Sequence, residues 1–248
     1  MMYLAHTAHA QFCALWMSSV GWTLTAVAMG LIQWRIWRVS DMEIITSGEA
    51  WVGIWRVCFN SHTDVTPSFQ IMHCRDISLT ETFTPPEIGA GQVLLLLSLL
   101  TGLCGNAGGV YAMRNVYFGI KDSPVRLVFF ITGVLCLLAA AMSLIPLVWN
   151  INSVVTNQTI KFPPEFQMPS APTSQTVGCG IGVGMVGSVL MIFSGIVFCT
   201  YRLPVRSQLR TQPALSQAVH LDCTVPARPA LTIMRGTDNP AFESHEHL

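Results

Sequence analysis

The chain has 248 residues, of which 51% are apolar and only 10% are charged, and its mean hydropathy is +0.50. Soluble globular domains carry about 25% charged residues, so this composition indicates a membrane protein. Thirteen basic residues balance thirteen acidic ones, and a net charge of zero offers no polyanion-binding surface, which excludes nucleic acid as a partner.

Four apolar segments are long enough to cross a bilayer as helices, which takes roughly 20 residues each. They are residues 12–34, 88–113, 127–149 and 177–201. None of the four contains an Asp, Glu, Lys, Arg or His residue. Pumps, ion-coupled carriers and voltage sensors keep ionisable groups inside their spans, so these classes are disfavoured. The first segment is too long for a signal peptide and no basic region precedes it, so we expect it to be retained.

The loop between the first two spans, residues 35–87, contains stretches with the composition of β-strands. Residues 43–46, 51–58 and 69–74 are rich in β-branched and aromatic side chains. Ser, Gly, Thr and Pro, which favour turns, lie between them. We expect a small antiparallel sheet, whose limited core needs a cross-link and the support of the membrane-embedded helices.

Cys58 and Cys74 lie in this loop and are candidates for that cross-link. An oxidising exterior lets two such cysteines pair. Closing the loop between them stabilises the fold by about 3 kcal/mol on the chain-entropy model. The alternative is two free thiols, which do not persist outside the cell, so we expect a disulfide.

The distribution of basic residues predicts which segments lie in the cytoplasm. They gather in residues 114–126, between the second and third spans, and at the start of residues 202–248. The positive-inside rule then places residues 1–11, the short loop and residues 202–248 in the cytoplasm. Residues 35–87 and 150–176 become the first and second extracellular loops.

Asn157 begins an Asn-Gln-Thr glycosylation sequon in the second extracellular loop. Such a sequon is used only on the lumenal side of the membrane, so it agrees with this orientation. The alternative is a triplet that occurs by chance. The expected protein is therefore multi-pass, with both termini in the cytoplasm.

The second extracellular loop also holds Phe162, Pro163 and Pro164, followed by Glu165 and Phe166. Aromatic side chains stiffened by prolines form a candidate contact surface for another protein. Alternatively, these residues lie on the protein's own sheet or on the lipid headgroups. The pattern by itself does not choose between the two.

Two residues on the cytoplasmic side are candidate attachment points. Cys199, at the inner end of the fourth span, is a candidate palmitoylation site, with packing as a small apolar residue as the alternative. Residues 202–248 show no sustained apolar period, and we expect them to be disordered. The terminal Leu248 is compatible with capture by a PDZ-type module.

The first extracellular loop and the residue before it resemble the signature of the claudin family, Trp followed by Gly-Leu-Trp-x-x-Cys and a second Cys. The residues that carry the resemblance are Trp34, Gly53, Ile54, Trp55, Cys58 and Cys74. Ile54 replaces the leucine of the signature, and spacing favours Trp34 over Trp37 for its first tryptophan. The third span and its end, residues 131–149, also resemble family members. The likeness runs from about residue 12 to residue 204.

The resemblance implies a left-handed bundle of four transmembrane helices under an extracellular antiparallel sheet. Most strands of that sheet come from the first loop and one from the second. It also implies a plasma-membrane protein of tight junctions that assembles with other claudin-like proteins, side by side in one membrane and head to head between cells. Such a protein seals the paracellular space or forms an ion-selective path through it.

In the family, charges near the second cysteine of the signature set the sign of the ions that pass. The candidates here are Arg75, Asp76 and Asp64. Arg75 favours repelling cations, whereas the two aspartates favour the opposite. Alternatively, they are ordinary solvated charges that form a weak local pair. Our hypothesis is a barrier-type member.

The chain departs from the family pattern at several points. The gap between Cys58 and Cys74 is longer than usual, which indicates an insertion in the hairpin. The family's arginine at the start of the second span is missing, and residues 89–92, Gly-Ala-Gly-Gln, stand there. The terminal Tyr-Val that the family uses for scaffold binding is also absent.

A four-span regulatory subunit of another membrane protein is the alternative function, because related four-span proteins share a similar sheet yet serve channels, receptors or myelin. An enzyme is disfavoured, since no Ser-His-Asp grouping, metal-ligand spacing or phosphate loop occurs at a plausible site. We therefore predict no catalytic residue, metal or other cofactor, and we expect membrane lipid and other claudin-like chains as partners.

Overall fold

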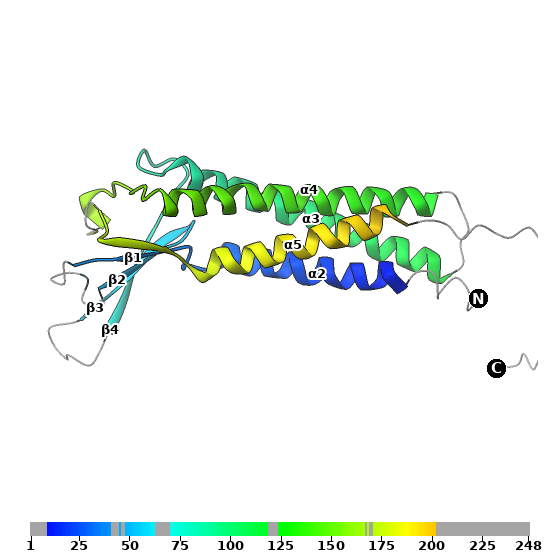
Figure 1. The fold of residues 1–248 in the computed structure, drawn as a ribbon, viewed down its shortest axis with the longest axis horizontal. Coiled ribbons are helices and arrows are strands. Elements are labelled where there is room, and N and C mark those ends of the chain that lie inside the picture. The colour runs from blue at the N-terminus through cyan, green and yellow to red at the C-terminus, as the bar shows by residue number, and fades with distance from the viewer. Residues whose placement is uncertain are drawn as a thin grey trace, which may run out of the picture. The chain divides into compact units, whose positions relative to one another are not determined.

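The computed structural model contains four long helices and a five-stranded sheet (Figure 1). It describes residues 9–40, 45, 48–62, 70–118, 124–166, 168 and 171–201. All of these residues lie within one unit, Met1–Val205. The predicted fold class, a transmembrane four-helix bundle with a small antiparallel sheet, is confirmed.

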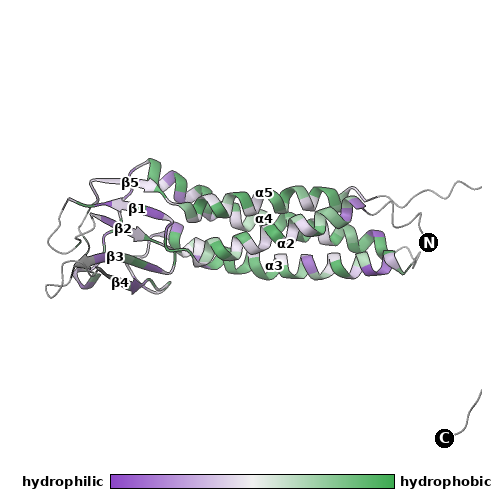
Figure 2. Cartoon of the chain, turned by 90° about the horizontal axis from the view of Figure 1, so that it is seen from below, coloured by the Kyte–Doolittle hydropathy of each residue, from purple (hydrophilic) through white to green (hydrophobic). Residues whose placement is uncertain are grey.

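The four helices are long and apolar enough to cross a membrane. They are α2 (His9–Gly30), α3 (Pro86–Tyr117), α4 (Pro124–Val155) and α5 (Cys179–Cys199). Large apolar side chains are exposed along all of them, for example Trp16, Leu100, Phe130 and Phe193. Figure 2 shows apolar residues over the bundle, with hydrophilic residues more frequent toward its two ends. Such an outer surface suits hydrocarbon rather than water.

Helix α2 ends at Gly30, four residues before the end of the apolar segment that predicts it. The reason is visible at Trp34, whose indole nitrogen donates a hydrogen bond of 2.7 Å to the carbonyl oxygen of Ala28. The same oxygen also accepts from the Leu31 backbone nitrogen at 3.3 Å, so the indole covers the last turn of the helix. The chain then leaves the helix and enters the first strand of the sheet.

Helix α4 has 32 residues, which corresponds to a length of about 48 Å. The hydrocarbon core of a bilayer is about 30 Å thick, so the helix extends well beyond it. Its last turns reach the sheet, where Asn150 and Ser153 are buried (Figure 1). This end of the bundle is the sheet end, and the opposite end is the far end.

Small residues bring the helices into close contact. A methyl group added to Gly21 of α2 would lie 2.7 Å from the carbonyl oxygen of Gly187 of α5, so neither position has room for a side chain. Ser143 and Ser188 share a hydrogen bond of 2.7 Å between α4 and α5. Small residues and hydroxyl hydrogen bonds are the usual means of helix packing in lipid, where no hydrophobic force drives association.

The five strands form one antiparallel sheet in the order β4-β3-β2-β1-β5. They are β1 (Arg35–Arg38), β2 (Glu49–Val52), β3 (Arg56–His62), β4 (Gln70–Asp76) and β5 (Ser174–Val177). Strand β5 comes from the second loop and pairs with β1, as the resemblance implies. The sheet thus joins both loops at one end of the bundle (Figure 1).

One face of the sheet packs onto the helices and the other face carries charged pairs. The packed face contributes Trp37, Val52 and Val57 to a core that also includes residues from the ends of all four helices. On the opposite face, charged side chains of neighbouring strands approach each other at 3.7–3.9 Å, Arg56 with Asp76 and Arg38 with Glu49. This division is the half-buried pattern of an antiparallel sheet.

Candidate interaction surface and its buried support

The disulfide lies in the outer hairpin of the sheet. Cys58 of β3 and Cys74 of β4 stand opposite each other and are bonded. Cys58 is fully buried, whereas Cys74 is exposed because β4 is an edge strand. An edge strand is held on one side only, so the cross-link fixes the register of β4 on β3.

Arg75 and Asp76 do not form the local pair considered from the sequence. Successive residues of a strand point to opposite faces, and the Asp76 carboxylate lies 3.7 Å from the Arg56 guanidinium on β3. Arg75 is exposed and has no carboxylate within 4.0 Å among the described residues. Asp64, the third candidate charge, lies outside the described residues.

The second-loop aromatics pack mainly on the protein itself. The ring of Phe162 lies 5.4 Å from that of Trp37 and 5.9 Å from that of Phe83, and both Phe162 and Phe166 are half-buried. Of the candidate contact residues, Pro163 is half-buried and only Pro164 is exposed. Most of the Phe162 side chain is therefore covered by the protein's own residues. The surface left for contact with another protein is the turn at Pro164.

Asn157, the sequon residue, is exposed just after the end of α4. Its φ of 52° places it in the left-handed region, which asparagine tolerates better than most residues. It therefore lies on the sheet side of the bundle, where its side chain is accessible.

The signature turn between β2 and β3 is fixed to the start of α3. Gly53 donates a backbone hydrogen bond of 2.9 Å to the carbonyl oxygen of Arg56 and lies against Ile32, just past α2. The buried Gln92 amide donates to the carbonyl oxygens of Ile54 (2.6 Å) and Ile77 (3.0 Å). Gln92 belongs to the segment in which the family has its arginine, and here this glutamine anchors the turn.

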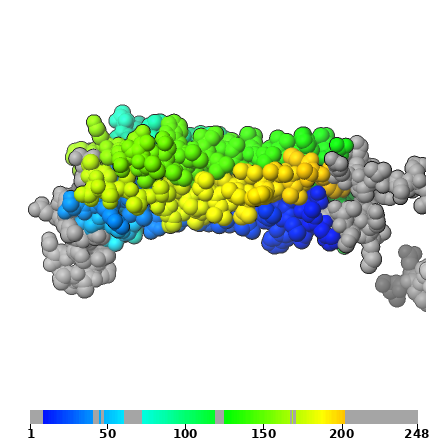
Figure 3. Space-filling view, in the orientation of Figure 1, coloured from blue at the N-terminus to red at the C-terminus, as the bar shows by residue number. Residues whose placement is uncertain are grey.

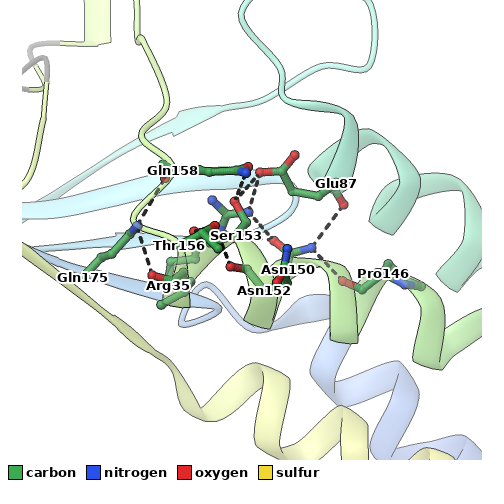
Figure 4. Close-up of polar contacts among 10 residues, drawn as sticks. Arg35, Glu87, Pro146, Asn150, Asn152, Ser153, Thr156, Gln158 and Gln175 are labelled. Atoms are coloured by element: carbon green, nitrogen blue, oxygen red, sulfur yellow. Dashed lines mark hydrogen bonds and ion pairs between the residues drawn. The ribbon is translucent and has the colours of Figure 1, made fainter.

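A buried polar network, missed in the sequence, connects the sheet to the bundle (Figure 4). Arg35 of β1 is fully buried, and its Nη2 lies 2.9 Å from Oε1 of Glu87 at the start of α3. The same nitrogen donates to Oδ1 of Asn150 near the end of α4 at 2.7 Å. The Ser153 hydroxyl donates to Glu87 Oε1 at 2.7 Å. Three elements from distant parts of the chain therefore meet at one guanidinium group.

The Arg35 and Glu87 side chains are charged and buried, so each one needs the other as a partner. Burial lowers the pKa of the Arg35 guanidinium from its ordinary value, and the hydrogen bond and charge of Glu87 oppose that shift. Removing one member of such a pair leaves an uncompensated buried charge and costs about 3–5 kcal/mol. Asn150 completes the arrangement, because its amide nitrogen donates to the backbone oxygens of Glu87 (3.1 Å) and Pro146 (2.9 Å). The network thus fixes the position of β1 on the helices.

The remaining predicted positions belong to other parts of the chain. Cys199 is half-buried between α4 and α5, with its sulfur 4.0 Å from the carbonyl oxygen of Phe130. Leu248 lies outside the described residues. Within the part of the chain that the structure describes, no group of three His, Cys, Asp or Glu side chains is placed to hold a metal ion.

The structure is that of a multi-pass membrane protein with four membrane-spanning helices. Its two loops form a disulfide-bonded sheet at one end of the bundle. The profile of the family described as "PMP-22/EMP/MP20/Claudin tight junction" matches residues 19–200, and the chain belongs to this family.

The curated relatives are claudins of low identity. Claudin-3 of Canis lupus familiaris and of Homo sapiens are each 26% identical over 182 residues, which cover 73% of this chain and 77% and 76% of the relatives. Claudin-4 of Bos taurus is 22% identical over 199 residues, which cover 79% of this chain and 88% of the relative. The similarity therefore includes the bundle and the sheet. The partners of the sheet surface and its charges follow from this chain's own residues.

Proposed function

We propose that this chain is a tight-junction protein that mediates adhesion between neighbouring cells and controls the paracellular space. The observation that carries the proposal is the disulfide-bonded sheet fixed to the end of four spanning helices by the Arg35–Glu87–Asn150 network. A sheet held rigidly at a constant distance from the bilayer is suited to repeated contacts with identical or similar sheets. Its partners are other claudin-like chains in the same and in the facing membrane.

In this proposal the sheet is extracellular and both termini are cytoplasmic. The exposed Asn157 sequon on the sheet side supports that orientation, as do the basic residues in the loop before α4 and after α5. The cytoplasmic Leu248 is then available to a PDZ-type scaffold.

The exposed Arg75 on the edge strand favours a barrier against cations. Its charge is not neutralised by a carboxylate among the described residues, whereas Asp76 is paired with Arg56. Fixed charge of one sign in a narrow wet space excludes ions of the same sign.

The experiment that tests the proposal is expression of the full chain in cells that lack tight junctions, followed by freeze-fracture imaging of cell contacts. Continuous intramembrane strands at contacts between expressing cells are the expected result. A Cys58→Ala/Cys74→Ala variant that reaches the cell surface is the matched control, with fewer or shorter strands. Abundant surface protein that forms only dispersed particles contradicts the proposal and favours the regulatory-subunit alternative.

A further inference from the structure

A groove of about 460 Å³ lies between α4 and α5 at the far end of the bundle. It is lined by Arg126, Leu127, Phe130, Cys199 and Tyr201. Figure 3 shows α4 and α5 side by side along this face of the molecule. A volume of this size is within the range of pockets that bind small molecules or parts of larger ones.

The shape of the groove follows from how the two helices pack. Toward the middle of the membrane the helix backbones touch, since a methyl group on Gly133 would lie 2.7 Å from the carbonyl oxygen of Gly195. Beyond this contact, aromatic rings hold the helices together, with Phe129 and Tyr201 at 4.4 Å between ring centroids. Phe129 and Tyr201 are both buried, so their rings form the floor on which the exposed Leu127 and Phe130 lie.

The lining residues combine an apolar wall with one positive charge. Leu127 and Phe130 are exposed and face what is hydrocarbon in a membrane. Arg126 is exposed as well and has no carboxylate within 4.0 Å among the described residues. In the sequence, Lys121 and Asp122 precede α4, and Arg202, Arg206 and Arg210 follow α5, so the segments that adjoin this end carry more basic than acidic residues.

We propose that the groove binds an anionic phospholipid, with the acidic headgroup on Arg126 and the start of an acyl chain over Leu127 and Phe130. Basic pockets between transmembrane helices on the cytoplasmic side bind anionic lipid headgroups, and tyrosines such as Tyr201 favour the headgroup level. The choice of leaflet depends on the orientation proposed above, because anionic lipids concentrate in the cytoplasmic leaflet. The binding itself does not depend on junction formation.

The test is native mass spectrometry of the purified full chain in detergent, titrated with phosphatidylserine or with phosphatidylcholine of the same acyl chains. Wild-type protein is expected to prefer phosphatidylserine. Arg126→Gln should lower its affinity for phosphatidylserine about fivefold, the effect of one basic residue near an anionic surface, and leave phosphatidylcholine binding unchanged. Arg114→Gln is the matched control, since Arg114 lies at the same end on α3, over the ring of Phe118 and outside the groove.

Three results would overturn the inference. In the first, Arg126→Gln binds phosphatidylserine as tightly as wild-type protein. In the second, Arg114→Gln weakens binding as much as Arg126→Gln, which indicates a diffuse charge effect. In the third, the intact mass of the purified protein carries an acyl group at Cys199, which makes a covalent chain the occupant of the groove. None of these results bears on strand formation between cells.

Discussion

Arg35 and Glu87 are 52 residues apart in sequence and form a buried ion pair of 2.9 Å where the sheet meets the bundle. The first residue opens strand β1 and the second lies at the start of α3. The pair therefore connects the beginning and the end of the first loop and fixes the whole sheet relative to the membrane helices.

Replacing one partner of this pair should destabilise the protein. Arg35→Gln or Glu87→Gln leaves an unpaired buried charge, which costs about 3–5 kcal/mol and lowers the melting temperature by roughly 10 °C. The measurement is thermal unfolding of the purified protein in detergent. The melting temperature of the double variant should fall by less than the sum of the two single-variant decreases, because no uncompensated charge remains.

The control for this prediction is Arg38→Gln. Arg38 faces Glu49 at 3.9 Å on the exposed side of the same sheet, and exposed pairs contribute only about 0–1 kcal/mol. The role of the buried pair would be contradicted if Arg38→Gln lowered the stability as much as Arg35→Gln. It would also be contradicted if the stability losses of the Arg35 and Glu87 variants were strictly additive.

Removal of the disulfide should also destabilise the fold. Cys58→Ala/Cys74→Ala removes the cross-link between β3 and β4, and we expect a loss of about 3 kcal/mol from the greater freedom of the unfolded chain. Thermal unfolding gives the size of the effect, and gel mobility with and without reductant reports the bond. Cys13→Ala, at an exposed free cysteine, should change neither. Wild-type protein whose Cys58 and Cys74 both react with a thiol reagent before reduction would refute the pairing.

Reversal of the charge at Arg75 should change ion selectivity. Arg75→Asp places a negative charge on the exposed edge strand, so the permeability of an expressing monolayer to sodium should rise relative to chloride. Dilution potentials measure that ratio. Arg75→Lys serves as the control, because it keeps the positive charge and should leave the ratio unchanged. If the ratio is the same in the Arg75→Asp variant and in wild-type protein, Arg75 has no part in selectivity.

Glycosylation of Asn157 tests the orientation. In the proposed topology the exposed sequon faces the lumen during synthesis, so glycosidase treatment should increase the gel mobility of wild-type protein. Asn157→Gln should migrate like the treated protein. Accessibility of a tag at residue 248 only after permeabilisation is an independent readout. A tag accessible on intact cells would reverse the topology.

The four helices could be predicted from the sequence because a spanning helix is marked by uninterrupted apolar residues. Strand β1 could not, since its four residues, Arg-Ile-Trp-Arg, directly follow the first apolar segment and are too few to show a period. Residues 51–58 suggest one strand, but the turn at Gly53 divides them between β2 and β3. A turn of this kind depends on the close approach of Ile32, which local sequence does not reveal.

The disulfide of the sheet can be predicted from the sequence, whereas the buried polar network beneath the sheet cannot. Cys58 and Cys74 stand out as the two cysteines of one loop, and the structure joins them. Arg35 has the appearance of an ordinary basic residue beside a span, and its burial becomes favourable only through Glu87 and Asn150, which are 52 and 115 residues away. Phe162 likewise resembles a surface aromatic until the distant Trp37 ring is placed against it.

In the proposed function, the sheet contacts similar proteins on a neighbouring cell. The most direct measurement is the enrichment of fluorescently labelled protein at contacts in mixed cultures. Enrichment is expected at contacts with cells that express this chain or Claudin-3, and not at contacts with cells that express neither. Equal fluorescence at both kinds of contact would contradict binding between sheets of neighbouring cells.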